Sequence, residues 1–499
     1  MFTKAAIGLL AVPFFADFSA ATTIPEVFPR ESSSGAARAC ARLKATFPDN
    51  YIDATSSNYT TEKDVNWSTN CRLPAACFFL PTSTEIVAQG LSIVTKANAK
   101  FAVRNGGHNP NIKFASIDGG VLFDMNRLKS LTLNSDKTIM HVGAGNRGGE
   151  VQGLADSAGK SAVTGIDMDP GISGLTLGGG YTHFSQLNGL VTDNVANFEV
   201  VLSNSSIVNA NATHNTDLYR ALRGGGNNFG IVTRFDLRAS PIYNIWYSLF
   251  LLDPKEYTEI IPAIVKVQNS MEKDPKANVE VLVSAKGVQI ALFYAEPESA
   301  KPEIFAPLLA FTPMLVVAPP TNGTVYEIMK DMSSPKEPLV RMVQSIIYKP
   351  STEFYLAQVK ELLKVTPPGE ELDLVLAIKP MGSRVASAGT KQAGGVPNSL
   401  NLPSIPQTWG SILVQYKEDK DKDLMTKKLR DLDAWMTSNA RRSNLLLPNL
   451  FANDAGSSQN VMASYGAESL ANLKSVSRKY DPAQVFQKLQ VGGFLVSKA

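Results

Sequence analysis

The 499-residue sequence is poor in histidine and cysteine, with four and three residues respectively. So few imidazoles and thiols leave too few ligands for a zinc site, and we expect no metal. Charged residues make up 19 % of the chain and the formal net charge is only +3. This balance gives no reason to expect a nucleic acid or an acidic membrane as a partner. Repeats of roughly 20–50 residues and low-complexity tracts are also absent from the sequence, which argues against a solenoid.

The apolar run at residues 5–18 is too short to cross a bilayer comfortably, because a spanning helix needs about 20 apolar residues. Lys4 precedes this run and small residues follow it, which is the order of a secretory signal peptide. A buried N-terminal helix is the alternative, but Pro13 and Asp17 would interrupt it. The sequence therefore predicts a signal peptide over residues 1–21 and a secreted protein.

Other features fit a secreted chain. In an oxidising compartment, Cys40, Cys71 and Cys77 allow one disulfide and one leftover thiol, and the sequence leaves the three pairings open. Five Asn-x-Ser/Thr sequons predict N-glycosylation at some of Asn58, Asn66, Asn204, Asn211 and Asn322.

Glycine and short β-branched segments dominate residues 72–240. Two segments, 83–99 and 147–159, have apolar residues three and four apart and predict helices. The expected order is α+β and not a regular doubly wound alternation. Strands are predicted at 76–81, 100–105, 119–125, 131–145, 161–165, 198–204 and 229–239.

From residue 244 to 450 glycine becomes rarer and longer helical patterns appear, which predicts a second domain, a sheet covered by helices. We expect a first domain over 22–243, a second over 244–450, and a C-terminal segment, 451–499, that returns to the first. The helical patterns lie at 253–272 and 418–440, and the strand-like runs at 279–296, 372–381 and 409–418.

A nucleotide motif, GAGNRG at 143–148, matches G-x-G-x-x-G between a predicted strand and a predicted helix. Asp167 lies about twenty residues farther on, where a ribose-binding acid is expected in a Rossmann unit. A nicotinamide-binding domain is therefore an alternative. Against it, the motif is short and common, and a secreted protein has little access to diffusible NAD.

The segment RNGGH, residues 104–108, places one of the four histidines directly after two glycines. Gly106 and Gly107 let the backbone approach a ligand closely and expose N–H groups to a phosphate, and Arg104 could add charge. On these residues alone, His108 is either a turn residue or a functional one.

Several motifs in a fixed order carry a more specific signal. RNGGH is followed by VTGIDMDPGISGLTLGGGYTHFSQLNGLVTDNVANFEVVLSN at 163–204, by DLYRALRGGGNNFGIVTRFDL at 217–237 and by the closing KYDPAQVFQKLQVGGF at 479–494. Together they resemble the vanillyl-alcohol-oxidase superfamily, with the berberine-bridge-enzyme-like oxidases as the nearest match. The resemblance implies a two-domain α+β fold with a PCMH-type FAD-binding domain and an antiparallel substrate-domain sheet covered by helices. It also implies FAD bonded through its 8α carbon to His108.

The resemblance assigns further cofactor-binding residues, although tight turns alone would also explain any single glycine. Doubly attached members carry a cysteine where this chain has Asp167, so we predict a single bond, through His108. Gln484 stands where the family often has asparagine. The assigned residues are Arg104, Asn105, Gly106, Gly107, His108, Gly165, Asp167, Gly171, Gly174, Gly178, Gly179, Gly180, Ile231, Val232 and Gln484.

The catalytic base is less defined. Carbohydrate-oxidising members carry a tyrosine base in an N-Y-A element, and the matching segment here has Asp454. The missing tyrosine and the missing thioether both argue against an oligosaccharide oxidase. Asp454 is a candidate base at this position, and a residue of a surface turn is the alternative interpretation. Tyr480, Lys379 and His183 are weaker candidates, for which helix capping, solvent exposure and a local polar contact are the respective alternatives.

The implied activity is that of a secreted FAD-linked oxidase. A hydride passes from a substrate C–H bond to flavin N5, a base removes the O–H or N–H proton, and molecular oxygen reoxidises the flavin. A small alcohol, phenol or alkaloid-like secondary metabolite is the expected substrate. An oligosaccharide oxidase, an NAD-dependent dehydrogenase and a non-catalytic binding protein with the same fold are the alternatives.

Overall fold

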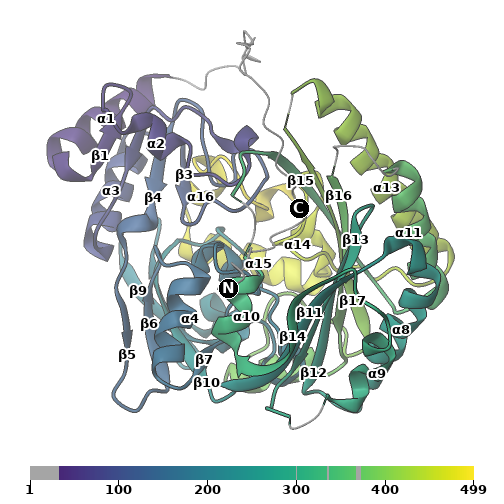
Figure 1. The fold of residues 1–499 in the computed structure, drawn as a ribbon. Helices are drawn as coiled ribbons and strands as arrows, with labels where there is room; N and C mark the ends of the chain where they lie inside the picture. The colour runs from purple at the N-terminus through teal and green to yellow at the C-terminus, as the bar shows by residue number, and fades with distance from the viewer. Residues whose placement is uncertain (1–32, 299–300, 334–335, 367–372, 418) are drawn as a thin grey trace.

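The computed structural model describes residues 33–298, 301–333, 336–366, 373–417 and 419–499. The predicted signal peptide lies outside the described residues. Figure 1 shows two smaller sheets of the N-terminal half on one side and a larger, green sheet with its helices on the other. The short C-terminal helices, in yellow, lie between these two halves.

The first sheet consists of β1 (Tyr51–Asp53), β2 (Cys77–Phe79), β3 (Phe101–Arg104) and β4 (Val121–Asp124). Its order is β1-β2-β4-β3, and the last three strands run parallel. Parallel strands are covered on both faces, and every residue of β2 and β4 is buried. The helices beside this sheet are α1 (Ser33–Thr46), α2 (Tyr59–Lys63) and α3 (Thr84–Lys96).

One disulfide joins the first helix to this sheet. Cys40 of α1 is bonded to Cys77 of β2, and Cys71 is a buried free thiol. The structure thus selects one of the three pairings that the sequence left open. Burial raises the pKa of the Cys71 thiol to about 12, so the group stays protonated and is a poor nucleophile.

The second sheet is antiparallel, with the order β5-β6-β10-β8-β9 and with β7 paired to β10. Its strands are β5 (Leu131–Leu133), β6 (Ile139–Gly143), β7 (Ser161–Ala162), β8 (Val195–Val201), β9 (Ile207–Asn211) and β10 (Ile231–Ser240). Its neighbouring helices are α4 (Gly148–Ser157), α5 (Ile172–Leu177), α6 (Ser185–Asn188) and α7 (Thr216–Leu222). All the strands and helices predicted for residues 72–240 are confirmed, with 131–145 split into two strands.

The topology of this sheet contradicts the nicotinamide alternative. GAGNRG does follow a strand, β6, and does precede a helix, α4. However, β6 pairs antiparallel with both of its neighbours, whereas a Rossmann unit needs parallel strands joined by the helix. Gly145 serves close packing instead, since a Cβ atom there would lie 2.4 Å from the Met125 carbonyl oxygen.

The third sheet is antiparallel throughout, in the order β14-β11-β13-β12-β16-β17-β15. The helices α8, α9, α11 and α13 cover one face and share an apolar core with it (Figure 1). This confirms the predicted sheet covered by helices. The strands are β11 (Asn244–Leu252), β12 (Ala277–Ser284), β13 (Gly287–Tyr294), β14 (Leu315–Thr324), β15 (Val340–Tyr348), β16 (Asp373–Met381) and β17 (Gln407–Tyr416). The helices of this part are α8 (Tyr257–Ser270), α9 (Ala306–Leu309), α10 (Val325–Asp331), α11 (Thr352–Val365), α12 (Val385–Gln392) and α13 (Lys422–Arg442).

The C-terminal segment carries α14 (Val461–Ser464), α15 (Ala467–Tyr480) and α16 (Val485–Lys488). Its end extends the first sheet, because Phe101 N donates to Leu489 O and Val491 N donates to Phe101 O, both at 3.0 Å. β10 ends at Ser240 and β11 begins at Asn244. The division into 22–243, 244–450 and a returning segment, 451–499, stays a prediction, and its first boundary falls between these two strands.

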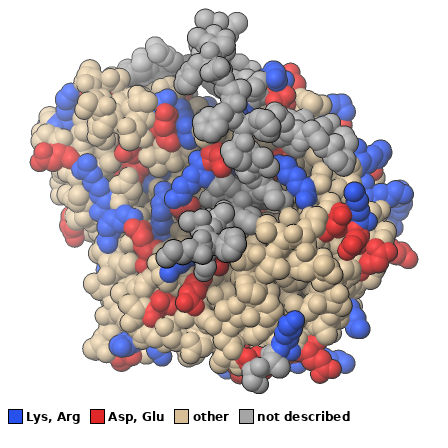
Figure 2. Space-filling model, viewed as in Figure 1, with Lys and Arg blue, Asp and Glu red and all other residues tan. Residues whose placement is uncertain are grey.

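The surface bears on two further expectations. In the described ranges, no helix combines the length and the apolar content that a membrane crossing requires. Lysine and arginine are interspersed with aspartate and glutamate on the face in Figure 2.

Of the predicted glycosylation sites, Asn58, Asn204 and Asn322 are exposed and Asn211 is half-buried. Asn66 is only 1 % exposed and its amide donates to Ala115 O, which excludes a bulky glycan there in the folded protein.

Candidate functional site

The loop after β3 carries the GGH element and passes another loop at backbone contact. A Cβ atom on Gly106 would lie 2.3 Å from Gly171 N, and one on Gly171 would lie 2.0 Å from Asn105 Oδ1. Gly107 has φ +66°, a conformation that disfavours any side chain. Glycine is therefore required at these positions for the close passage that the sequence suggested.

Arg104 does not offer its charge to a ligand, contrary to the sequence-based expectation. Its side chain is 1 % exposed and every guanidinium nitrogen is engaged. Nε contacts Asp124 Oδ2 at 2.5 Å, Nη1 donates to Asn66 Oδ1 at 3.0 Å, and Nη2 pairs with Glu62. Arg104 thus anchors the start of the loop from beneath.

His108 stacks on Trp67, with ring centroids 4.1 Å apart and planes inclined by 11°. The residue is half-buried as a whole, but its Nε2 atom is enclosed and has no hydrogen-bond partner among the described residues. The pKa of His108 is lowered to about 4, chiefly by burial; Asp169 opposes this shift, and Arg341 and Arg147 add to it. The imidazole is therefore neutral at physiological pH and keeps a nucleophilic lone pair.

The loop at 165–171 lies against the GGH loop through Arg147. This side chain donates to the carbonyl oxygens of Asp169 and of Gly106, the latter at 3.3 Å. Asp167 Oδ1 accepts from Asp169 N at 2.9 Å. A carboxylate at 167 offers no thiol for a thioether bond, and its bond to the backbone holds the turn instead.

The glycine run at 178–180 follows α5. Gly179 and Gly180 have φ of +113° and +75°, so both require glycine. A Cβ atom on Gly174 would meet no atom within 4 Å, so that glycine leaves open space. Gly165 faces Leu175, which a Cβ atom would approach to 2.9 Å.

Residues 451–457, here called the 451–457 segment, connect these loops to the third sheet. The Asn453 side chain donates to Gly174 O and accepts from Gly180 N, both at 3.0 Å. The backbone oxygen of Ala455 accepts a hydrogen bond from the side chain of Asn111 at 2.9 Å. Asn111 follows His108 by three positions on the GGH loop. Asp454 is therefore held between the glycine run and the GGH loop.

Two of the four residues that the sequence offered as a candidate base, Lys379 and Asp454, meet at this segment. Lys379 Nζ, from β16, lies 2.5 Å from Asp454 Oδ2, and the two side chains are 12 % and 19 % exposed. The same ammonium group lies 5.8 Å from the ring centres of Tyr181 and Phe451. The site thus combines a carboxylate, a cation and aromatic surface, and Lys379 does not point to open solvent.

The remaining nominated residues lie elsewhere. Tyr480 donates to Asp217 at 2.8 Å and to Asn215 at 3.1 Å, and it makes no contact with Lys379 or Asp454. Gln484 has φ +58° and donates to Asp481 O at 2.6 Å, which caps the turn before α16. Ile231 and Val232 are buried at the start of β10.

The sequence motifs did not point to a buried polar group that lies beside the site. Glu280 on β12 is 6 % exposed and lies 3.2 Å from Nδ1 of His183, whose ring packs on Phe293. Asn278, also on β12, donates to the Tyr181 hydroxyl at 3.0 Å. The signal was present as polar residues alternating with buried valines along β12. His183 thus satisfies a local polar contact, as its alternative interpretation proposed.

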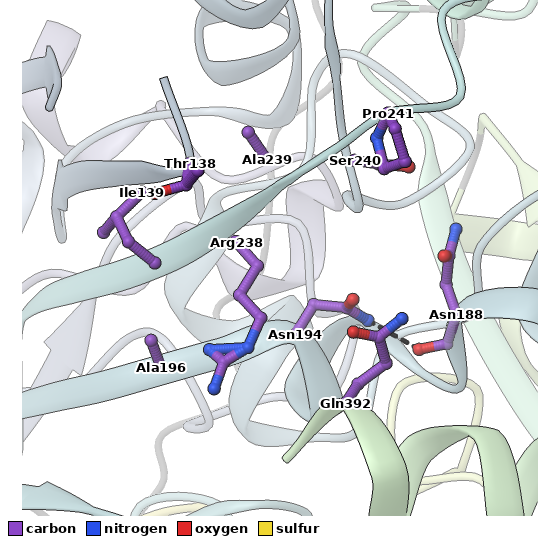
Figure 3. Close-up of a pocket in the computed structure, with 10 residues that line it drawn as sticks. All are labelled: Thr138, Ile139, Asn188, Asn194, Ala196, Arg238, Ala239, Ser240, Pro241 and Gln392. Atoms are coloured by element: carbon purple, nitrogen blue, oxygen red, sulfur yellow. Dashed lines mark hydrogen bonds between the residues drawn. The ribbon is translucent and has the colours of Figure 1, made fainter. Parts of the chain in front are cut away.

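A separate cavity of about 450 Å³ lies at the far end of β10, beside Arg238, Asn194 and Gln392 (Figure 3). None of its lining residues belongs to the GGH loop, the glycine run or the 451–457 segment, so it is distinct from the candidate site. In the described part of the chain, no group of three or more histidine, cysteine, aspartate or glutamate side chains could hold a metal ion.

Comparison with known proteins identifies the ligand class. Residues 75–211 match the family model described as "FAD binding domain". The FAD-dependent monooxygenase yanF of Aspergillus niger is 31 % identical over 492 residues, 96 % of this chain and 83 % of its own length. The FAD-dependent monooxygenase macF of Penicillium terrestre is 32 % identical over 452 residues, 89 % of this chain and 86 % of its own.

The fold is also that of solved flavoenzymes. The glucooligosaccharide oxidase of Acremonium strictum superimposes with a TM-score of 0.75 at 17 % identity, covering 90 % of this chain and 97 % of its own. The matching family model and the fungal relatives indicate FAD as the cofactor, and not the nicotinamide cofactor of the alternative interpretation. The chain belongs to the family of FAD-dependent oxidoreductases that includes these fungal monooxygenases, and its fold is that of the solved FAD-linked oxidases.

Proposed function

We propose that this protein oxidises a small alcohol, phenol or alkaloid-like secondary metabolite with molecular oxygen as the electron acceptor. The observation that carries the proposal is the 451–457 segment. Through Asn453 and Ala455, it places the Lys379–Asp454 pair beside the loop that carries His108. A candidate base and a candidate cofactor anchor thus share one site.

The residues present fit FAD attached by a single histidyl bond. Among the residues that the structure describes, the enclosed Nε2 atom of His108 has no hydrogen-bond partner, and neither has the enclosed Nδ2 atom of Asn105 next to the Gly106–Gly171 contact. Asp167 cannot form a thioether. When bound, FAD supplies the redox chemistry, taking a hydride from the substrate carbon and passing the electrons to oxygen.

Asp454 and Lys379 supply the proton chemistry in this proposal. The Asp454 carboxylate accepts the proton of a substrate O–H or N–H group as the adjacent C–H bond is oxidised. The Lys379 ammonium pairs with that carboxylate and stabilises negative charge that develops on the substrate oxygen. Tyr181 and Phe451 beside the cation provide surface for an aromatic or apolar substrate.

The fungal relatives support a secondary-metabolite substrate. Besides the two monooxygenases, the bifunctional solanapyrone synthase of Alternaria solani is 31 % identical over 483 residues, 93 % of this chain and 90 % of its own length. Oligosaccharide oxidation is the second candidate, because the Acremonium protein has the same fold. The aspartate at 454, in place of a tyrosine base, disfavours it.

A peroxide-release screen tests the proposal. The purified protein is offered alcohols, phenols, alkaloid-like amines and oligosaccharides, with His108→Ala and Asp454→Asn variants as references. Peroxide from a small aromatic or alcohol substrate, lost in Asp454→Asn, is expected. Turnover of oligosaccharides alone would establish the second candidate, and a colourless protein without flavin would overturn both. Secretion from residues 1–21 is also a proposal, tested by N-terminal sequencing of protein recovered from the medium.

A further inference from the structure

The imidazole of His108 belongs to a larger stack that crosses between the two halves of the molecule. The indole ring of Trp67 contacts the imidazole at 4.1 Å, and the guanidinium of Arg341 lies 4.1 Å from the Trp67 ring centre. Arg341 lies on β15, the edge strand of the third sheet, 233 residues after His108 (341 minus 108). The Trp67 ring thus contacts both the Arg341 guanidinium of one domain and the His108 imidazole, the candidate flavin anchor, of the other.

Burying the charged guanidinium of Arg341 costs desolvation free energy, so its contacts must compensate for that cost. Its side chain is fully buried, and its hydrogen bonds all go to neutral oxygens of the described residues. Nε donates to Gln415 Oε1 at 2.8 Å, Nη1 to Trp67 O at 2.5 Å and Nη2 to Glu337 O at 3.1 Å. A buried cation whose hydrogen bonds go to neutral oxygens is unfavourable unless other contacts compensate; the nearby charge of Glu337 and the face of the indole ring are two such contacts.

The backbone around Trp67 is fixed from both sides. Trp67 N donates to Gly107 O at 3.0 Å, directly before His108. On the other side, Ser68 Oγ accepts from Arg341 N at 2.7 Å, and Thr69 N donates to Leu339 O at 3.0 Å. The backbone that carries the indole is therefore fixed to both domains, and the ring itself contacts the His108 imidazole and the Arg341 guanidinium.

We propose that Trp67 and Arg341 are positioning residues for covalent flavin attachment, because their stack holds the His108 imidazole in the orientation that bond formation requires. This inference rests on the proposed attachment of FAD to His108. In that step an imidazole nitrogen bonds to the 8α carbon. One methyl proton and the imidazole N–H proton pass to the flavin, together with the electron pair of the broken C–H bond. Molecular oxygen then reoxidises the flavin and leaves as hydrogen peroxide.

A second buried arginine offers a matched control. Arg223 is also fully buried and also lies over an aromatic ring, at 4.2 Å from the centre of Tyr219. Its partners are Asp193 and the backbone of residues 396–397, and it makes no contact with His108 or Trp67. Replacing either arginine by lysine keeps the charge but loses the planar stack.

The test measures the rate at which flavin becomes acid-stable, in protein sampled over time with added FAD, alongside total bound flavin and Tm. We expect Trp67→Phe and Arg223→Lys to attach flavin like the wild type. Trp67→Leu and Arg341→Lys should still bind FAD but attach it about tenfold more slowly or worse, since small misplacements of reacting groups are costly.

Wild-type attachment rates in both Trp67→Leu and Arg341→Lys would overturn the inference while leaving the proposed function intact. Fully extractable flavin in the wild type would instead overturn the attachment through His108, and this inference with it. A Trp67→Leu chain that does not fold leaves the decision to Arg341→Lys, in which the indole is retained.

Discussion

At the scale of single residues, the site depends on protonation states that burial and neighbouring charges fix in advance. His108 is held neutral by burial and by Arg341 and Arg147, with Asp169 as the opposing charge. Asp454 pairs with the Lys379 ammonium at 2.5 Å. A neutral imidazole is the state of His108 that flavin attachment requires.

The first prediction concerns the pH dependence of flavin attachment. Because the pKa of His108 is lowered from 6.5 to about 4, the imidazole is already neutral at pH 5.5. The attachment rate, followed as acid-stable flavin, should therefore be nearly constant from about pH 5.5 to 8 and should fall only as pH approaches 4. A decline centred near pH 6.5 would show that His108 titrates as in water.

The second prediction concerns Asp454. Removing a general base typically costs about 10²- to 10⁴-fold in rate, so Asp454→Asn should lower kcat by at least about 100-fold while flavin content stays unchanged. Asp373→Asn is the matched control, because that carboxylate lies on β16, the strand of Lys379, and pairs with Lys286 at 3.8 Å. Equal losses in the two variants, measured as peroxide release, would remove Asp454 from the mechanism.

At the scale of secondary-structure elements, the 451–457 segment positions the candidate site, and the Cys40–Cys77 disulfide stabilises the first domain. The 451–457 segment has no helix or strand of its own, and Asn453 ties it to the glycine run after α5. The Cys40–Cys77 bond performs a comparable structural function for α1 and β2 at the opposite edge of the first domain. These two connections should therefore differ in what their loss affects.

The third prediction separates positioning from stability. Asn453→Ala removes two hydrogen bonds, which should cost about 1–3 kcal/mol of stability, and it should also lower kcat because Asp454 is displaced. Asn460→Ala removes the side-chain cap of α14, whose N–H donor is Ala463, at a cost of about 1 kcal/mol. We expect Asn460→Ala to keep the wild-type kcat. Normal turnover in Asn453→Ala would contradict the role assigned to this side chain.

The fourth prediction concerns the disulfide. It closes a separation of 37 residues, so the Cys40→Ser, Cys77→Ser double variant should lose about 2–4 kcal/mol of unfolding free energy. Denaturant unfolding measures this loss, and attached flavin per molecule should not change. Cys71→Ala, which keeps the disulfide, is the comparison. A larger effect in Cys71→Ala would indicate that the pairing had been misassigned.

At the scale of the whole molecule, local patterns predicted many of the elements, but not β11, β14, β15 or α11, and motif order predicted the family. Alternating β-branched runs marked β8 and β10, and apolar spacing marked α3 and α13, because these signals are contained within each segment. β14 was missed because its APPTNG residues are turn signals. It tolerates prolines as the edge strand of the third sheet, where backbone N–H groups need fewer partners.

Long-range contacts account for the rest of what the sequence could not provide. Asn453 contacts glycines that lie more than 270 residues earlier, and Trp67 meets Arg341 across 274 positions. Neither of these contacts produces a periodic pattern in the sequence that could have predicted it. Arg104 was misjudged for a related reason, since the burial that occupies its guanidinium comes from Glu62, Asn66 and Asp124.

The central claim is that His108 carries the flavin, and the mass of the peptide containing that residue tests it most directly. After digestion of the purified protein, that peptide should be heavier by one FAD, or by its hydrolysis product FMN, and fluorescent after acid treatment. The same peptide from His108→Ala should have its unmodified mass. An unmodified mass in the wild type, or flavin on any other residue, would contradict the account.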